Sequence, residues 1–349
     1  MNNLNSRQIK ILEIIKPQQS IGPKEILEQL NQKVSVITVS RDLSELVELK
    51  YLQRNGSGPA TQYSLLPKTL FFRPIDYRKY FEIETDNRDI LVNFNLDIFD
   101  QLSQVTIFTP TEQTQLDVLD QKFRNNYSQL SPTIIKKEIE RVTIELSWKS
   151  SVIEGNTYSL LETERLIKEG SEAKGKKKEE ATMLLNHKKA LDFVFENKDL
   201  FKTIDRAKIE QLHKIITQDL GINNNLRKTL VGITGTKFKP LDNQFQIAEA
   251  IDKFCNLINT TQNIFIKSLF SIILLSYIQP FEDGNKRSSR ILGNAILIAN
   301  NSFPLPLRSV DENLYKEATL LFYEQNNLNL FKQMFLDQCL FSVESYFKV

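Results

Sequence analysis

Residues 279 to 290 read Gln-Pro-Phe-Glu-Asp-Gly-Asn-Lys-Arg-Ser-Ser-Arg and stand directly before an apolar helical run, residues 291–299. A glycine-containing turn that opens a helix leaves backbone N–H groups unpaired, and the helix dipole attracts anions there. Asp283 beside such a turn can hold Mg²⁺. Arg287 and Arg290 are three residues apart, so they share a helix face from which they can contact phosphate oxygens. The segment therefore predicts a nucleotide-phosphate site.

The length and composition of the chain indicate a globular protein of more than one domain. Its 349 residues exceed what one compact domain usually needs, so we expect two or three domains. Hydrophobic residues make up 41% and charged residues 25%, which is enough apolar material for a sizeable core. The net charge of +2 is too small to indicate that the chain as a whole binds nucleic acid or membranes.

Cysteine usage and hydropathy indicate the compartment. Cys255 and Cys339 lie in apolar helical patterns without zinc-ligand spacing, which favours buried thiols in a reducing environment. The first residues show no signal-peptide pattern. The apolar stretch 264–278 is interrupted by lysine and serine and is too short to span a bilayer. We therefore expect a cytoplasmic protein without membrane partners, and both a monomer and a homo-oligomer remain open.

Residues 1–66 are predicted to form a separate N-terminal domain. Three short amphipathic helices are followed by a strand, a turn containing Asn55-Gly56-Ser57-Gly58-Pro59, and a second strand. Three helices and a hairpin are the layout of a winged helix-turn-helix domain. Residues 36–43 resemble the recognition helix of DeoR-type regulators, whose early polar residues contact DNA in the major groove. By this resemblance the DNA-facing residues would be Ser35, Thr38, Ser40 and Arg41 on the helix and Arg54 on the wing.

The charge of this domain leaves a second interpretation open. Residues 1–66 hold eight basic and six acidic residues, a net charge of +2. Affinity for DNA comes mainly from the neutralisation of phosphates, and few charges are available for it here. A winged helix that binds another protein therefore remains an alternative to one that binds DNA.

The rest of the chain is predicted to be mainly helical. Residues 67–130 are expected to be a helical connector without chemistry of its own, and residues 131–349 a second domain. After the wing, the only plausible strands lie between Leu230 and Leu241. Helices are expected near residues 160–169, 176–196, 205–218, 246–260, 263–278, 285–300, 311–325 and 328–347.

Residues 279–290 resemble the signature of Fic domains, His-Pro-Phe-x-(Asp/Glu)-Gly-Asn-(Gly/Lys)-Arg-x-x-Arg. The matching positions are Pro280, Phe281, Asp283, Gly284, Asn285, Lys286, Arg287 and Arg290. Residues 150–156, Ser-Ser-Val-Ile-Glu-Gly-Asn, resemble the family's inhibitory motif, Ser/Thr-x-x-x-Glu-Gly/Asn. Residues 227–241 look like the family's flap. The resemblance covers roughly residues 90 to 340 and implies a Fic helical core with a short β-hairpin flap; residues 67–130 would include its N-terminal part.

The resemblance implies ATP and Mg²⁺ as cofactors and AMP transfer to a hydroxyl of a target protein. Asp283 would hold Mg²⁺. The nucleotide-binding residues would be Gly284, Asn285, Lys286, Arg287 and Arg290. Of these, Arg287 would contact the β-phosphate and Arg290 the γ-phosphate. The flap residues Val231, Gly232, Ile233 and Thr234 would align the target by strand pairing. Doc-like members share Lys286 and are associated with phosphate transfer, so the transferred group stays open.

Two residues imply that activity is restrained. In the family the inhibitory glutamate, here Glu154, pairs with the second motif arginine, here Arg290, and displaces the γ-phosphate. Gln279 stands where the family has the catalytic histidine, and an amide cannot accept the proton of an attacking hydroxyl. The loss of a general base typically costs about 10²–10⁴ in rate. His187 and His213 are expected to be structural.

Three interpretations remain open at this point. The chain is an AMP transferase with weak or altered chemistry, or a catalytically degenerate Fic core that binds a nucleotide and regulates transcription through the winged helix. The third is a helical interaction scaffold that binds no nucleotide.

Overall fold

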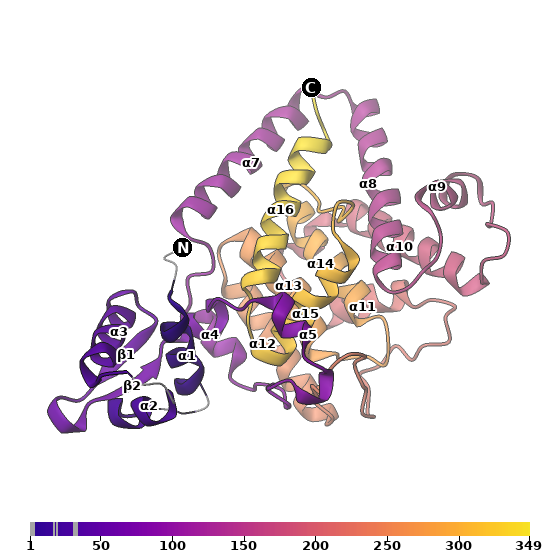
Figure 1. Ribbon diagram of the computed structural model, residues 1–349. Helices are drawn as coiled ribbons and strands as arrows, with labels where there is room; N and C mark the ends of the chain where they lie inside the picture. The colour runs from indigo at the N-terminus through magenta and orange to yellow at the C-terminus, as the bar shows by residue number, and fades with distance from the viewer. Residues whose placement is uncertain (1–3, 17, 19, 31–33) are drawn as a thin grey trace.

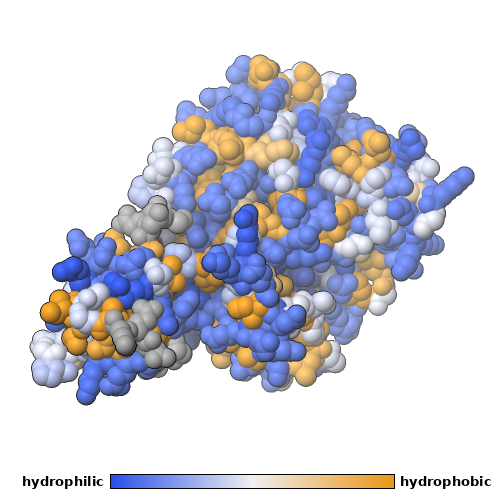
Figure 2. All heavy atoms as spheres, viewed as in Figure 1, coloured by the Kyte–Doolittle hydropathy of each residue, from blue (hydrophilic) through white to orange (hydrophobic). Residues whose placement is uncertain are grey.

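The computed structural model describes residues 4–16, 18, 20–30 and 34–349. These residues form sixteen α-helices and one two-stranded antiparallel sheet, so the predicted mainly helical fold is confirmed. Figure 1 shows a small N-terminal unit beside a larger helical body. None of the helices in the described ranges is both long and apolar enough to cross a membrane. The face drawn in Figure 2 is mainly hydrophilic, with hydrophobic residues scattered in small groups.

The N-terminal unit is a winged helix-turn-helix. Its elements are α1 (Ser6–Ile15), α2 (Pro23–Leu30), α3 (Val36–Glu48), β1 (Leu52–Asn55), a 3-10 turn (Gly58–Ala60) and β2 (Gln62–Leu65). The two strands pair antiparallel, with Leu52 opposite Leu65. Apolar residues at helical spacing, such as Leu12, Ile26 and Leu43, are fully or almost fully buried in a core of this unit's own. This separate core explains why the segment could be recognised from its pattern alone.

The connector packs on the helical body. It contains α4 (Pro67–Phe72), α5 (Tyr77–Glu82), a 3-10 turn (Thr85–Asn87), α6 (Ile98–Ser103) and α7 (Pro110–Gln129). Thr109 and Glu112 form a capping box at the start of α7, with Pro110 in the first turn. Phe71 and Ile98 of the connector are fully buried in the core cluster of the body. Residues 67–130 are therefore a packed part of the larger unit.

The body is a helical bundle around α13 and α14, the most extensively packed helix pair. Its helices are α8 (Pro132–Ile153), α9 (Leu160–Glu169), α10 (Lys178–Glu196), α11 (Arg206–Ile216), α12 (Gln244–Thr260), α13 (Ile264–Ile278), α14 (Asn285–Ala299), α15 (Glu312–Gln325) and α16 (Asn329–Ser345), with a 3-10 turn at Lys198–Lys202. These bounds agree with the predicted helices to within about two residues at most ends. Helix α13 is apolar on nearly all sides because it is surrounded by neighbours. A Cβ at Gly293 would lie 2.5 Å from Ile272 Cγ1, so this glycine lets α13 and α14 approach closely.

The flap segment differs from the predicted hairpin. Residues 230–241 turn at Thr234 and Gly235, but the segment forms no strand ladder. Its backbone instead makes an isolated parallel bridge between Lys239 and Asn93 of the connector. Gly235 has a φ of 86°, which suits a turn, and Pro240 has no N–H with which to pair. The segment is therefore an extended loop held by the connector.

Candidate functional site

The loop between α13 and α14 forms one wall of a cavity of about 420 Å³. Gln279 ends α13 in the left-handed region with a φ of 52°, and Gly284 precedes α14 with a φ of 82°. The end of α8, the flap and α15 supply the other walls. The lining residues are Ile153, Glu154, Gly155, Val231, Gly232, Ile233, Thr234, Gln279, Glu282, Asp283, Gly284, Asn285, Lys286, Arg287, Tyr315, Lys316, Thr319, Leu320 and Tyr323. The structure thus brings the predicted loop, inhibitory and flap residues to one place.

Gly284 is required by both its conformation and its surroundings. A Cβ on it would lie 2.9 Å from Thr217 Cγ2 and 3.3 Å from His213 Nε2. A residue with φ near 82° also strains any L side chain. Glycine therefore lets the loop close tightly over α11 and present the first N–H groups of α14 to the cavity.

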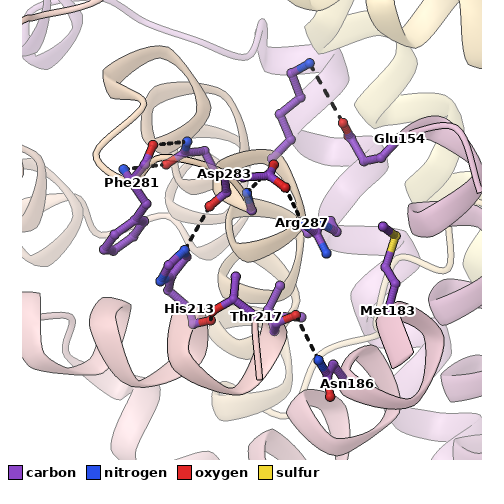
Figure 3. Close-up of polar contacts among 12 residues, drawn as sticks. Glu154, Met183, Asn186, His213, Thr217, Phe281, Asp283 and Arg287 are labelled. Carbon is purple, nitrogen blue, oxygen red and sulfur yellow. Dashed lines mark hydrogen bonds and ion pairs between the residues drawn. The ribbon is translucent and has the colours of Figure 1, made fainter. Parts of the chain in front are cut away.

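His213 supports the loop from beneath. Its ring stacks on Phe281 with centroids 3.7 Å apart, and Nε2 donates to the carbonyl oxygen of Asp283 at 2.9 Å (Figure 3). Burial lowers the pKa of His213 to about 4, so the imidazole is neutral at physiological pH. His213 was expected only to be structural, and its contact with the loop was not predicted. The sequence gives no sign of this contact, because His213 and Asp283 are 70 residues apart.

Asp283 is the carboxylate at the mouth of the loop. Its side chain is 67% exposed, its Oδ1 accepts from the Gly284 N–H at 2.6 Å, and its Oδ2 lies 3.0 Å from Arg287 Nη2. Figure 3 shows Asp283 linked to both His213 and Arg287. An exposed carboxylate beside backbone N–H groups and an arginine fits a hard cation that is shared with phosphate oxygens.

Arg287 and Arg290 are buried cations with free hydrogen-bonding capacity. Their side chains are 3% and 0% exposed. Within the described residues, Nη1 of each finds no hydrogen-bond partner. Burial lowers the pKa of Arg287 from its ordinary value because the charge of Asp283 compensates only in part. Arg287 lines the cavity, whereas Arg290 does not and lies behind Glu154. A buried guanidinium with an unpaired N–H group in the cavity wall fits an anionic ligand such as a phosphate chain.

Glu154 occupies the space next to Arg290. Gly155, at a φ of 96°, ends α8 so that Glu154 caps its C-terminus, where the helix dipole disfavours a carboxylate. Arg290 Nη2 donates to Glu154 Oε1 at 2.8 Å, and Lys286 Nζ lies 3.9 Å from Oε2. Burial alone would raise the pKa of Glu154, but the charges of Arg290 and Lys286 outweigh it and hold this pKa below its ordinary value. Glu154 is therefore an ionised carboxylate that lines the cavity and pairs with Arg290.

Ser150, the first residue of the segment that resembles the inhibitory motif, contributes to the same arrangement. Its hydroxyl accepts from Arg290 Nε at 2.8 Å, and its carbonyl oxygen accepts from Nη2 at 2.9 Å. Both contacts come from the last turn of α8, one turn before Glu154. Arg290 is thus held at three points by Ser150 and Glu154, which fixes its guanidinium behind the cavity wall formed by Glu154.

Gln279 is bound into the loop at both ends of its amide. Its Nε2 donates to the carbonyl oxygen of Ser276 at 2.7 Å, and its Oε1 accepts from Asn285 Nδ2 at 2.9 Å. Asn285 Oδ1 in turn accepts from the Phe281 N–H at 2.9 Å. Arg227 Nε donates to the carbonyl oxygen of Gln279 at 2.6 Å, a contact that the sequence did not predict. These hydrogen bonds hold the loop in shape. They also fix the side-chain amide of Gln279, which cannot act as a base, in the cavity wall.

The two histidines do not supply the missing base. Both ring nitrogens of His187 are buried and lack hydrogen-bond partners in the described part of the chain. Burial and the charges of Arg287 and Arg290 lower the pKa of His187 well below its usual range. His213 is occupied by its contact with Asp283. Neither histidine lines the cavity.

The predicted DNA-facing residues gather at the start of α3 and on the wing. Ser40, Arg41 and Arg54 are exposed. Ser35 caps α3, because its Oγ accepts from the Thr38 N–H at 3.2 Å and lies 2.9 Å from Thr38 Oγ1. Two further exposed residues complete this surface: Val36 is 63% exposed and Ile37 is 74% exposed. Exposed apolar residues beside polar ones at the start of this helix suit contact with base edges and thymine methyl groups.

Comparisons with known proteins agree with this geometry. Residues 203–297 match the model of the Fic/DOC family, and residues 7–61 match the DeoR-like helix-turn-helix domain. A curated relative, Protein adenylyltransferase Fic of Nematostella vectensis, is 27% identical over 220 residues, which cover 59% of this chain and 49% of the relative. The chain thus spans about half the length of that relative.

Similar solved structures show the fold of the body. Fic-1 from C. elegans matches with a TM-score of 0.57 and 20% identity, covering 68% of this chain and 72% of that one. A Fic domain containing signaling protein from Bacteroides thetaiotaomicron matches with a TM-score of 0.55 and 18% identity, covering 66% and 96%. The chain therefore carries a segment at residues 7–61 that matches a DeoR-like helix-turn-helix domain and a segment at residues 203–297 that matches the Fic/DOC family, within a body of Fic-like fold.

Proposed function

We propose that the chain binds ATP with Mg²⁺ in the cavity and transfers AMP to a hydroxyl of a target protein. In this proposal Glu154 inhibits nucleotide binding, and Gln279, which cannot act as a base, slows the transfer. The observation that carries the proposal is the buried guanidinium of Arg287 in the cavity wall, whose Nη1 has no partner among the described residues. Arg290 lies behind Glu154 and also has an unpaired Nη1 among these residues. The curated relative at 27% identity is named as a protein adenylyltransferase, which supports the class of reaction.

Different groups of the loop would bind the phosphate oxygens and the Mg²⁺ ion. The first N–H groups of α14 and the guanidinium of Arg287 would hold phosphate oxygens, since both point charge or dipoles toward the cavity. Asp283 would hold Mg²⁺, which would neutralise phosphate charge when bound. Rotation of Asp283 away from Arg287 would free both groups for the ligand.

The flap would position the target. Residues 231–234 line the cavity without a strand ladder of their own, so their backbone groups are available to an incoming peptide. The hydroxyl of that peptide would approach the loop near Gln279. The amide of Gln279 can orient this hydroxyl but cannot take its proton, so transfer would be slow.

A second candidate function is a nucleotide-responsive transcriptional regulator with a catalytically degenerate Fic core. The engagement of both ends of the Gln279 amide within the loop favours it, because the residue then acts in structure and not in proton transfer. In this case the winged helix would carry the output to DNA. The two candidates share nucleotide binding and differ in whether any group is transferred.

Nucleotide binding tests the proposal directly. Titration of the full chain with Mg-ATP by calorimetry is expected to give saturable binding, and Arg287→Ala is expected to weaken it by about 10- to 100-fold, the value of one charge-assisted contact. Arg124→Ala is a matched control, because Arg124 is 45% exposed and pairs with Asp120 away from the cavity. Equal affinities for the two variants would contradict the assignment of Arg287.

DNA binding by the winged helix is a separate prediction. The full chain is expected to bind double-stranded DNA with an affinity that falls with salt, and Arg41→Ala is expected to reduce the slope of log K against log salt by about 0.9. Fluorescence anisotropy across a salt series measures this slope, again with Arg124→Ala as control. An affinity for DNA that does not change with salt would favour a winged helix that binds protein.

A further inference from the structure

One of the contacts between the winged-helix unit and the body is made to a buried amide, that of Gln325. Lys16, which follows α1, donates from Nζ to Oε1 of Gln325, the last residue of α15. Arg73 of the connector donates to the same oxygen from Nη2 at 2.5 Å. A single amide oxygen thus accepts from one cation of the winged unit and one of the connector, so its position depends on both.

Hydrogen bonds continue from this amide toward the flap. Gln325 Nε2 donates to the Tyr80 hydroxyl at 3.2 Å, and that hydroxyl donates to Glu324 Oε2 at 2.6 Å. Glu324 Oε1 lies 3.5 Å from Arg88 Nη2, which also donates to the carbonyl oxygen of Gly235. Arg88 and Glu324 have side chains that are 4% and 0% exposed. The pair of Arg88 and Glu324 is therefore shielded from water, where the loss of one partner of an ion pair is costly, whereas Lys16 and Tyr80 are only half-buried.

The far end of this chain is the flap of the cavity. Gly235 directly follows the lining residues 231–234 and has a φ of 86°. The guanidinium of Arg88 also stacks 5.1 Å from the ring centre of Phe81, which fixes its direction. Lys237 Nζ donates to the carbonyl oxygen of Asp86 at 2.6 Å, a second tether that does not involve Glu324.

The contact at Lys16 is sensitive to the position of the winged unit. Burial and the nearby charge of Arg73 lower the pKa of Lys16 to about 8. Returning Lys16 to water would therefore raise its pKa toward the ordinary value and stabilise its charged form, while Gln325 Oε1 would lose one of its two donors. A small movement of α1 would therefore change the hydrogen bonding of Gln325.

We infer that Arg88 is a positioning residue for the flap, and that the contacts from Lys16 through Gln325, Tyr80 and Glu324 to Arg88 make the flap's position depend on the winged-helix unit. The inference rests on the proposed function only in that the flap borders the proposed nucleotide site. The dependence works in both directions, because a coupling free energy between two sites is reciprocal.

Hydrogen exchange at the Lys239 amide tests the coupling. This N–H donates to the Val92 carbonyl oxygen at 2.7 Å and so reports opening of the flap's attachment. In the full chain without nucleotide, Lys16→Ala is expected to speed this exchange about threefold to tenfold, the range of mutations within a coupled network. Lys79→Ala is a matched control, since Lys79 borders the same interface but is 81% exposed and pairs with Asp76. Unchanged exchange in Lys16→Ala would overturn the inference.

Double variants show whether the effect travels through Arg88. Arg88→Gln is expected to speed exchange more than Lys16→Ala, and adding Lys16→Ala to it is expected to change nothing further. In a Lys237→Ala background, by contrast, Lys16→Ala should still act. Additive effects in the Arg88→Gln background would overturn the pathway. If Arg88→Gln does not fold, Tyr80→Phe breaks the same chain by removing one hydroxyl.

The outcome is independent of the proposed function because no nucleotide is present. Absence of Mg-ATP binding in calorimetry would overturn the nucleotide proposal, whereas unchanged Lys239 exchange in Lys16→Ala would overturn the coupling.

Discussion

Replacing Glu154 by glycine is expected to raise the affinity of the chain for Mg-ATP by about 10- to 100-fold, the value of one or two charge-assisted hydrogen bonds. Glu154 Oε1 now accepts from Arg290 at 2.8 Å, and the carboxylate stands beside Lys286 at the cavity wall. Without it, both cations are free for a phosphate group. Calorimetric titration of the full chain and the variant measures the change.

The same substitution is expected to lower stability in the absence of ligand. Arg290 is fully buried, and removing its carboxylate leaves a buried charge unmatched, which typically costs about 3–5 kcal/mol. Bound Mg-ATP should restore most of this loss, so the shift in melting temperature on adding nucleotide should be larger in the variant. Glu154→Gln keeps the size of the side chain and removes its charge, so its affinity and stability should lie between those of the native chain and those of Glu154→Gly. Equal affinity in all three proteins would contradict autoinhibition.

Gln279→His in the Glu154→Gly background is expected to raise transfer from ATP by about 10²–10⁴-fold, the usual contribution of a general base. Histidine tolerates the left-handed backbone that position 279 adopts better than most residues do. Its ring would stand at the cavity where the amide now stands. Labelling of protein from ATP carrying the isotope on the α- or the γ-phosphate measures the rate and identifies the transferred group.

Gln279→Ala in the same background is the control for structure. It removes the hydrogen bonds to Ser276 and Asn285, each worth about 1 kcal/mol, so it should reduce stability without raising transfer. A histidine variant no more active than the alanine variant would contradict the role of a base at this position. Transfer by the native chain at the rate of the histidine variant would show that Gln279 does not limit the chemistry.

Features set by short-range interactions could be predicted from the chain alone. The helices began and ended where capping residues and apolar spacing placed them, as the capping box of Thr109 and Glu112 illustrates. The winged unit was recognisable because its small core is built from neighbouring segments. The loop 279–290 was recognisable because its glycine, helix start and arginines follow one another directly. The hairpin expected at 230–241 was not found, since its backbone pairs with Asn93 instead of with itself.

The sequence by itself determined the residue types of the site: the glycine turn, the arginines of α14, the carboxylate of Glu154 and the amide at position 279. Only the tertiary structure decided their partners. Arg290 meets Glu154 across 136 residues, His213 supports the loop across 70, and Arg88 holds the flap across 147. Local propensity follows from near neighbours, whereas these contacts exist only after α8, α11 and α15 have packed around α13 and α14. Side chains far apart in the chain are joined by the burial of apolar helix faces, which no single segment encodes.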